Sequence, residues 1–228
     1  MSAIAPTNVT DRTVPSRYIV VEGPIGVGKT SLARKLSDSL GGSLMLEETD
    51  SNPFLERFYQ GERKAALATQ LFFLFQRMKQ LEVLRQADLF TQIRIADFHI
   101  HKDRLFAEVS LDAEELALYE QIYERVAVEV PEPDLVIYLQ APVDALLQRI
   151  LRRGVPHERL IERRYLERLT EAYARHFHHY QEAPLLIVNA ASIDPISNNS
   201  EYEQLLHQIK QTTSGRHFFN PASVTAFV

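Results

Sequence analysis

The chain has 228 residues and a formal net charge of −5, with 25 Lys and Arg against 30 Asp and Glu. This acidic balance gives no overall attraction to nucleic acid or to an anionic membrane, so neither is expected as a partner. The length and the 45% hydrophobic content suit one α/β domain with a sizeable core. The absence of cysteine excludes disulfides and thiolate metal sites, and it fits a reducing, cytoplasmic compartment.

Residues 1–16 are polar and contain two prolines, without the apolar segment of a signal peptide. They predict a disordered tail ahead of a single domain at residues 17–228. No apolar stretch in the sequence is long enough to span a bilayer.

The most informative segment is GPIGVGKT at residues 23–30, which follows an apolar run and leads into a helical pattern. The spacing G-x-x-x-x-G-K-[ST] between a strand and a helix is typical of a phosphate-binding P-loop. Backbone N–H groups and the helix N-terminus face the phosphates, Lys29 reaches the outer phosphates, and Thr30 can hold Mg²⁺. The predicted phosphate-binding residues are Gly23, Pro24, Ile25, Gly26, Val27, Gly28, Lys29, Thr30 and Ser31.

Strand and helix patterns alternate along the chain. Strands are expected at residues 18–22, 43–47, 92–97, 135–139 and 185–188. Helices are expected from the P-loop to about 40, from 52–53, and at 64–85, 103–108, 112–128, 142–152, 158–180 and 202–210. This alternation predicts an α/β fold with a doubly wound, five-stranded parallel sheet flanked by helices. The segment from residue 215 onward, which contains three phenylalanines, is expected to pack back on the body.

Ligands of such sheets bind beyond the carboxyl ends of the strands, which puts the P-loop and two carboxylates on one rim. Asp97 ends a strand and suits Mg²⁺, directly or through water. Glu47 or Glu48 ends another strand and could accept a proton from an acceptor hydroxyl. The arginines of segment 149–153 precede a Gly- and Pro-containing loop, from which they could close over a phosphate.

Together these motifs resemble the deoxyribonucleoside kinase family, in particular its bacterial deoxyadenosine and deoxyguanosine kinases. The P-loop is widespread, so the more specific resemblance lies in the later segments. These are EETDSNPFLERFY at 47–59, Thr69-Gln70 with Arg77 seven residues on, Asp97 with KDRLFA at 102–107, and residues 149–158. The resemblance implies a P-loop kinase fold with a lid, ATP as phosphate donor, Mg²⁺, and phosphorylation of a deoxyribonucleoside 5′-hydroxyl.

The resemblance also implies roles on the acceptor side. Glu47, preferred to Glu48 for its distance from Asn52-Pro53, is the general base. Tyr59 and Glu158 bind the sugar 3′-hydroxyl, and Gln70 pairs with the base edge. The implied substrate-binding residues are Glu47, Tyr59, Gln70, Arg77, Asp97, Asp103 and Glu158. Arg77 and Asp103 would flank the base, and through Gln70 with Asp103 the resemblance favours a purine.

On the donor side the resemblance implies that Arg149 and Arg153 bind the transferring phosphates from the lid. The implied catalytic residues are Lys29, Glu47, Arg149 and Arg153, and the implied Mg²⁺ ligands are Thr30 and Asp97. The family resemblance further favours a homodimer.

The chain departs from the family pattern after the third strand. The family commonly has an acidic residue, then Arg, then Ser or Thr, whereas this chain has Asp97, Phe98 and His99. The Arg that supports both the base and the transferring phosphate is therefore missing. Lys102 or Arg104 could substitute for it.

The lid segment departs as well, with Val155 and His157 in place of an Arg and an acidic residue. Two alternatives stay open. A nucleoside monophosphate kinase of the thymidylate type needs arginines near Glu47, for which Arg57 and Arg77 are the candidates. A nucleotide-binding, kinase-like regulatory subunit would have lost turnover.

Two further patterns have simpler structural interpretations. His176 and His179 share a helix face, but two ligands are too few for a metal site, and a surface helix end is expected. The apolar run at 71–75 is expected to be core or a helix–helix dimer face.

Overall fold

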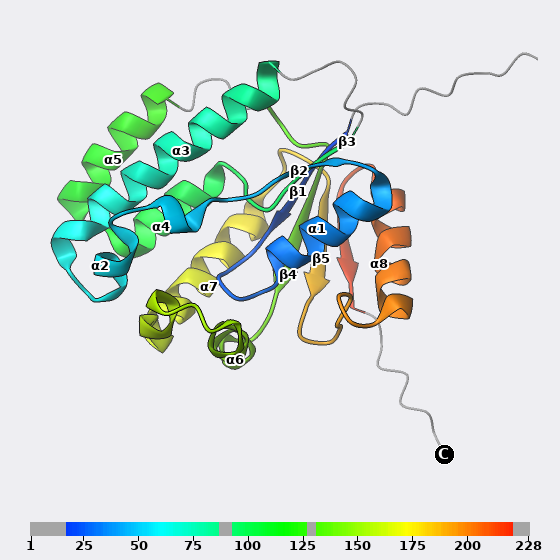
Figure 1. Cartoon of the computed structure of the whole chain (residues 1–228). Coiled ribbons are helices and arrows are strands. Elements are labelled where there is room, and N and C mark those ends of the chain that lie inside the picture. The colour runs from blue at the N-terminus through cyan, green and yellow to red at the C-terminus, as the bar shows by residue number, and fades with distance from the viewer. Residues whose placement is uncertain (1–16, 87–92, 127–130, 221–228) are drawn as a thin grey trace, which may run out of the picture.

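The computed structural model describes residues 17–86, 93–126 and 131–220 (Figure 1). Six parallel strands form one sheet in the order β2-β3-β1-β4-β5-β6. The strands are β1 (Arg17–Glu22), β2 (Ser43–Met45), β3 (Ile93–Ala96), β4 (Leu135–Gln140), β5 (Leu185–Asn189) and β6 (Arg216–Phe219). The predicted doubly wound parallel sheet is confirmed, and the predicted tail at 1–16 lies outside the described residues.

The prediction of five strands is wrong, because β6 pairs in parallel with β5 from Leu185↔Arg216 to Val188↔Phe219. The expected packing of this segment against the body takes the form of an edge strand. Four residues with a partly exposed RHFF pattern carry too little apolar alternation to be recognised as a strand from sequence. Backbone pairing with β5 therefore decides their conformation.

Helices cover both faces of the sheet. They are α1 (Lys29–Leu40), α2 (Leu55–Tyr59), α3 (Ala66–Gln86), α4 (His101–Ser110), α5 (Ala113–Val126), α6 (Val143–Arg153), α7 (Arg163–His179) and α8 (Asn199–Gln211). Helices α1, α6 and α8 pack on one face, and α3, α4, α5 and α7 pack on the other (Figure 1). Strand β1 contributes to the core on both faces of the sheet. Ile19 and Val21 pack on the side of α1, α6 and α8, and Tyr18 and Val20 pack on the side of α3, α4, α5 and α7.

Several predicted helix boundaries are wrong. Helix α7 begins at Arg163 rather than Glu158, which lies in a short 3₁₀ turn, η3 (His157–Leu160). Helix α4 runs over ten residues rather than 103–108. Asn52 does not open a helix directly. Its side chain accepts a hydrogen bond from the Phe54 N–H at 3.0 Å, and α2 starts one residue later. Polar turns of this kind compete with regular helix.

The P-loop leaves the end of β1 and enters α1 at the same edge of the sheet as the ends of β2 and β3 (Figure 1). Gly23, Gly26 and Gly28 have φ angles of 147°, 81° and 108°, which side-chain-bearing residues rarely adopt. Across the described ranges, no helix combines the length and apolarity that crossing a membrane requires.

Candidate active site

The P-loop lysine folds over its own loop. Lys29 Nζ donates hydrogen bonds to the carbonyl oxygens of Gly23 at 2.7 Å and Pro24 at 3.1 Å. Burial, and then the nearby charge of Lys102, lower the pKa of the Lys29 ammonium to about 8, against the opposing effect of three carboxylates. The ammonium therefore lies against the P-loop, whose backbone N–H groups can surround a phosphate.

Asp97 connects the P-loop to the end of β2. One carboxylate oxygen accepts a hydrogen bond from the Thr30 hydroxyl at 2.5 Å, and the other accepts one from the Glu47 N–H at 2.8 Å. The Asp97 side chain is buried. Two oxygen donors from different elements thus lie within hydrogen-bonding distance at the rim, a donor set that suits Mg²⁺.

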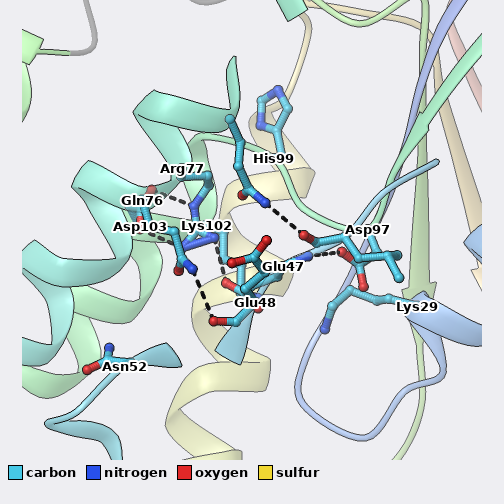
Figure 2. Close-up of polar contacts among 12 residues, drawn as sticks. Lys29, Glu47, Glu48, Asn52, Gln76, Arg77, Asp97, His99, Lys102 and Asp103 are labelled. Atoms are coloured by element: carbon cyan, nitrogen blue, oxygen red, sulfur yellow. Dashed lines mark hydrogen bonds and ion pairs between the residues drawn. The ribbon is translucent and has the colours of Figure 1, made fainter. Parts of the chain in front are cut away.

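Glu47 lies between cations, as Figure 2 shows. One carboxylate oxygen pairs with Arg77 Nη1 at 2.6 Å and the other with Lys102 Nζ. Arg77 also forms two 2.7 Å bonds to Asp103, and both of these side chains are almost fully buried. Burial alone would raise the pKa of Glu47, but Lys102 and Arg77 outweigh it and hold the pKa at about 2. Glu47 is therefore an ionised carboxylate at neutral pH.

Sequence reasoning missed Glu22, which is 1% exposed. Its carboxylate accepts hydrogen bonds from the N–H groups of Gly23 and His99, at 3.0 and 2.7 Å, and from the Tyr173 hydroxyl at 2.7 Å. It thereby joins the P-loop, the segment after β3 and α7. A carboxylate ending an apolar strand just before the first P-loop glycine was the available signal.

The predicted base-edge residue, Gln70, is 2% exposed on α3. Next to it, the Thr69 carbonyl accepts a 3.2 Å hydrogen bond from the buried Asn52 side chain. This bond fixes the segment before α2 against α3. Gln70 and Arg77 both lie on α3.

Of the two predicted sugar-binding residues, Tyr59 contacts His157, and Glu158 follows His157 in the chain. Tyr59 ends α2, and its ring stacks on His157 with centroids 6.1 Å apart and planes 7° apart. Burial raises the pKa of the Tyr59 hydroxyl well above its usual value. Glu158, next in the chain, pairs with Arg153 Nη2 at 2.5 Å. His157, a departure from the family pattern, thus contacts a predicted substrate residue.

Arg149 is anchored rather than free to swing. Its guanidinium donates to the Val27 carbonyl at 3.0 Å and to the Ala190 carbonyl at 2.6 Å. It thereby ties α6 to the P-loop and to the loop after β5. Together with Arg153, it lines a cleft of about 990 Å³ whose walls include residues 26–32 and 190–197. The role of loop 190–197 as a wall was not predicted.

Three other sequence candidates lie away from Glu47. Arg104 and Arg57 are exposed and pair with Glu120 and Glu62, respectively. Glu48 is exposed, and its main-chain carbonyl accepts hydrogen bonds from the Gln76 side chain at 3.1 Å and the Ser51 hydroxyl at 2.8 Å. Of the two cations considered for the missing family Arg, Lys102 is therefore the one that reaches Glu47. Of the two arginines that a monophosphate acceptor would need, only Arg77 does.

The remaining two patterns are resolved differently. His176 is half-buried beside His101, with ring centroids 5.2 Å apart, so the expected surface helix end applies only to His178 and His179. In the run at 71–75, Leu74 is buried in the core while Phe75 is 53% exposed.

A family model described as deoxynucleoside kinase matches residues 19–214, most of the chain. The chain belongs to the deoxynucleoside kinase family. Membership makes it a phosphotransferase that acts on a nucleoside hydroxyl. The match ends just before β6, so this edge strand lies outside the part shared with the family model.

Relatives of this family member are similar over most of its length. A deoxyguanosine kinase of Bacillus subtilis is 38% identical over 201 residues, which cover 85% of this chain and 96% of the relative. A deoxyadenosine/deoxycytidine kinase of the same organism is 30% identical, covering 86% and 93%. The solved structure of a deoxyadenosine kinase from M. mycoides with bound dATP is 26% identical, with a TM-score of 0.75, covering 85% and 99%.

Proposed function

We propose that this chain transfers the γ-phosphoryl group of ATP to the 5′-hydroxyl of a purine deoxyribonucleoside. The observation that carries the proposal is the ionised Glu47 carboxylate, held by Arg77 and Lys102 at the same rim as the P-loop Lys29. A kinase of this class needs a hydroxyl, a base beside it and a triphosphate aligned behind it.

On the acceptor side, Glu47 takes the proton from the 5′-hydroxyl as that oxygen bonds to the γ-phosphorus. The bond from the γ-phosphorus to the bridging oxygen breaks, and ADP leaves. Each carboxylate oxygen has more than one lone pair, so contact with a cation leaves room for the substrate hydroxyl. Tyr59 and Glu158 hold the 3′-hydroxyl in this proposal, which fits the stacking of Tyr59 on His157, the residue before Glu158.

On the donor side, the triphosphate lies in the 990 Å³ cleft between the P-loop and α6. Lys29 and the P-loop N–H groups bind its outer phosphates, and Arg153 approaches from the lid. Thr30 and Asp97 offer the oxygen ligands that Mg²⁺ prefers, and the fit supports them as its holders. When bound, the ion would neutralise charge on the phosphates.

The preference for a purine rests on the relatives and on α3. Of the relatives quoted above, those at 38% and 26% identity are named as a deoxyguanosine kinase and a deoxyadenosine kinase, and the one at 30% as a deoxyadenosine/deoxycytidine kinase. Gln70 offers one donor group and one acceptor to a base edge, and Arg77 with Asp103 forms the rigid pair beside it. Both features support a planar base bound against α3.

We also propose a homodimer built on α3 and α5. These helices are neighbours (Figure 1). They expose Phe75 and Leu118, at 53% and 47%. Large apolar side chains exposed on adjacent helices favour a helix–helix contact with a second copy.

The test is ADP release from ATP and Mg²⁺ with a panel of deoxyribonucleosides and their monophosphates. We expect turnover with deoxyguanosine or deoxyadenosine and a loss of about 10²- to 10⁴-fold in kcat in Glu47→Gln, because that variant loses the base. Glu48→Gln is the matched control, since Glu48 is the next residue in the chain and its side chain is exposed.

Three results would contradict the proposal. Full activity in Glu47→Gln would mean that Glu47 is not the general base. Turnover of monophosphates alone would favour a thymidylate-type kinase. Nucleotide binding without turnover of any acceptor would favour the regulatory subunit.

A further inference from the structure

We propose that Lys102 is the positioning residue that holds the Glu47 carboxylate in place for proton abstraction. The inference rests on the proposed function of Glu47 as general base. It assigns this part to Lys102 of the first turn of α4, where the sequence left Lys102 and Arg104 as alternatives.

The Lys102 side chain is buried and paired with Glu47. Its Nζ pairs with one Glu47 oxygen, and its side chain is only 7% exposed. Among the contacts of the described residues, this is its single ion pair, while the Phe106 ring lies 5.3 Å from Nζ on the other side. A lysine ammonium this well buried is costly unless it is paired, so the pairing with Glu47 explains where the side chain points.

Arg77 cannot do this task alone. Two of its nitrogens are bound to Asp103 at 2.7 Å, so its guanidinium is oriented by that carboxylate. Only Nη1 reaches Glu47. One contact to one oxygen leaves the carboxylate free to rotate about it, whereas a second cation on the other oxygen fixes its plane. Figure 2 shows Lys102 and Arg77 reaching Glu47 from neighbouring helices.

The second cation comes from α4, because the residue after Asp97 is an uncharged phenylalanine. Phe98 is fully buried in the core layer formed with α3, α4, α5 and α7, and its ring lies 5.4 Å from the Arg77 guanidinium carbon. Phe98 carries no charge, so it cannot pair with Glu47 as an Arg at this position could. Phe98 therefore packs against the Arg77 guanidinium, and Lys102 supplies the second positive charge to Glu47.

Consecutive residues of α4 serve the same cluster with opposite charges. Lys102 pairs with Glu47, and Asp103 pairs with Arg77. The backbone at this turn is fixed by the Lys102 N–H bond to the His99 carbonyl at 3.1 Å. Lys102 also lowers the pKa of Lys29, which places both ammonium groups near the same rim. A displacement of about 1 Å in Glu47 would misalign it with the acceptor hydroxyl and cost on the order of 100-fold in rate.

The experiment compares kcat and KM of the wild type, Lys102→Met, Lys102→Arg and Arg104→Met with ATP and the preferred deoxyribonucleoside. We expect Lys102→Met to lower kcat about 10- to 100-fold with an unchanged KM for ATP. Lys102→Arg keeps the charge and should retain most activity. Arg104→Met is the control, because Arg104 lies on the same helix but is exposed and paired with Glu120.

A second variant separates position from folding. Lys102→Ala leaves space for a small amine, so methylammonium should restore part of its kcat, whereas tetramethylammonium, which cannot donate a hydrogen bond, should not. A merely structural lysine would show no such difference. Lys102→Met with wild-type kcat, or Lys102→Ala with equal responses to both salts, would overturn the inference. A wild type without nucleoside kinase activity would overturn the proposed function and this inference together.

Discussion

Arg77 joins three segments that are distant in sequence. It pairs with Asp103 on α4 and with Glu47 after β2, and it lies over the ring of Phe98. Its side chain is only 3% exposed, so removing either carboxylate would leave a buried charge partly uncompensated. The carboxylate of the proposed base is therefore also part of the charge balance of the buried cluster.

The lowered pKa of Lys29 leads to a prediction at the residue scale. Free Lys29 loses its proton above about pH 8, and bound phosphate favours the charged form. Affinity for a non-hydrolysable ATP analogue should therefore fall as pH rises above 8, by up to roughly tenfold per pH unit. Calorimetric titration between pH 7 and pH 9 measures this.

Lys29→Arg is the comparison, because a guanidinium stays charged throughout that range. Its affinity should vary little with pH. An equal loss of affinity in both proteins would mean that another group titrates.

At the scale of elements, the P-loop is shaped by the helix packed over it. A Cβ atom on Gly26 would lie 2.8 Å from Ile150 Cγ1 and 2.9 Å from the Leu146 carbonyl oxygen, both on α6. The same helix carries Arg149, whose bond to the Val27 carbonyl closes the contact. The loop and the lid-bearing helix therefore behave as one unit in this structure.

Gly26→Ala should accordingly destabilise the protein and weaken ATP binding. The expected loss in the free energy of unfolding has two parts: about 1–3 kcal/mol for the positive φ, and about 1–3 kcal/mol for overpacking against α6. Urea unfolding and a nucleotide titration measure the two effects.

Gly61→Ala is the matched control, because its φ of 83° is close to the 81° of Gly26 and no described atom lies within 4 Å of its added Cβ. It should show the backbone cost alone and normal ATP binding. Equal destabilisation of the two variants would refute the packing argument.

At the scale of the whole molecule, the layer of α3, α4, α5 and α7 covers one face of the sheet (Figure 1). It carries Arg77 and Asp103 as well as the exposed Phe75 and Leu118. Phe75 is only two residues from Arg77 on α3. A second copy docked on α3 and α5 would therefore stiffen the helix that orients the proposed base.

Phe75→Glu should dissociate the proposed dimer, since it buries a carboxylate in an apolar contact. Sedimentation equilibrium measures the mass. Leu151→Glu is the control, because Leu151 is 61% exposed on α6, away from α3 and α5. A monomeric wild type, or a dimer that Phe75→Glu leaves intact, would contradict this interface.

Patterns that depend on near neighbours were predictable from the sequence. The P-loop needs glycines, a lysine and a threonine at adjacent positions, and alternating strand and helix signals indicate a parallel sheet whatever the details of packing. Glu47 and Asp97 could be placed on one rim because parallel strands end at the same edge.

Tertiary packing alone decided which of two nearby cations on α4 reaches Glu47. Lys102 and Glu47 are 55 residues apart, and nothing local distinguishes Lys102 from Arg104 or Glu47 from Glu48 in charge. Burial makes the distinction, because a charged group inside the protein must face its partner while an exposed one need not. Strand β6 also depends on tertiary structure, because its four residues form their backbone pairing with β5, which is distant in the sequence.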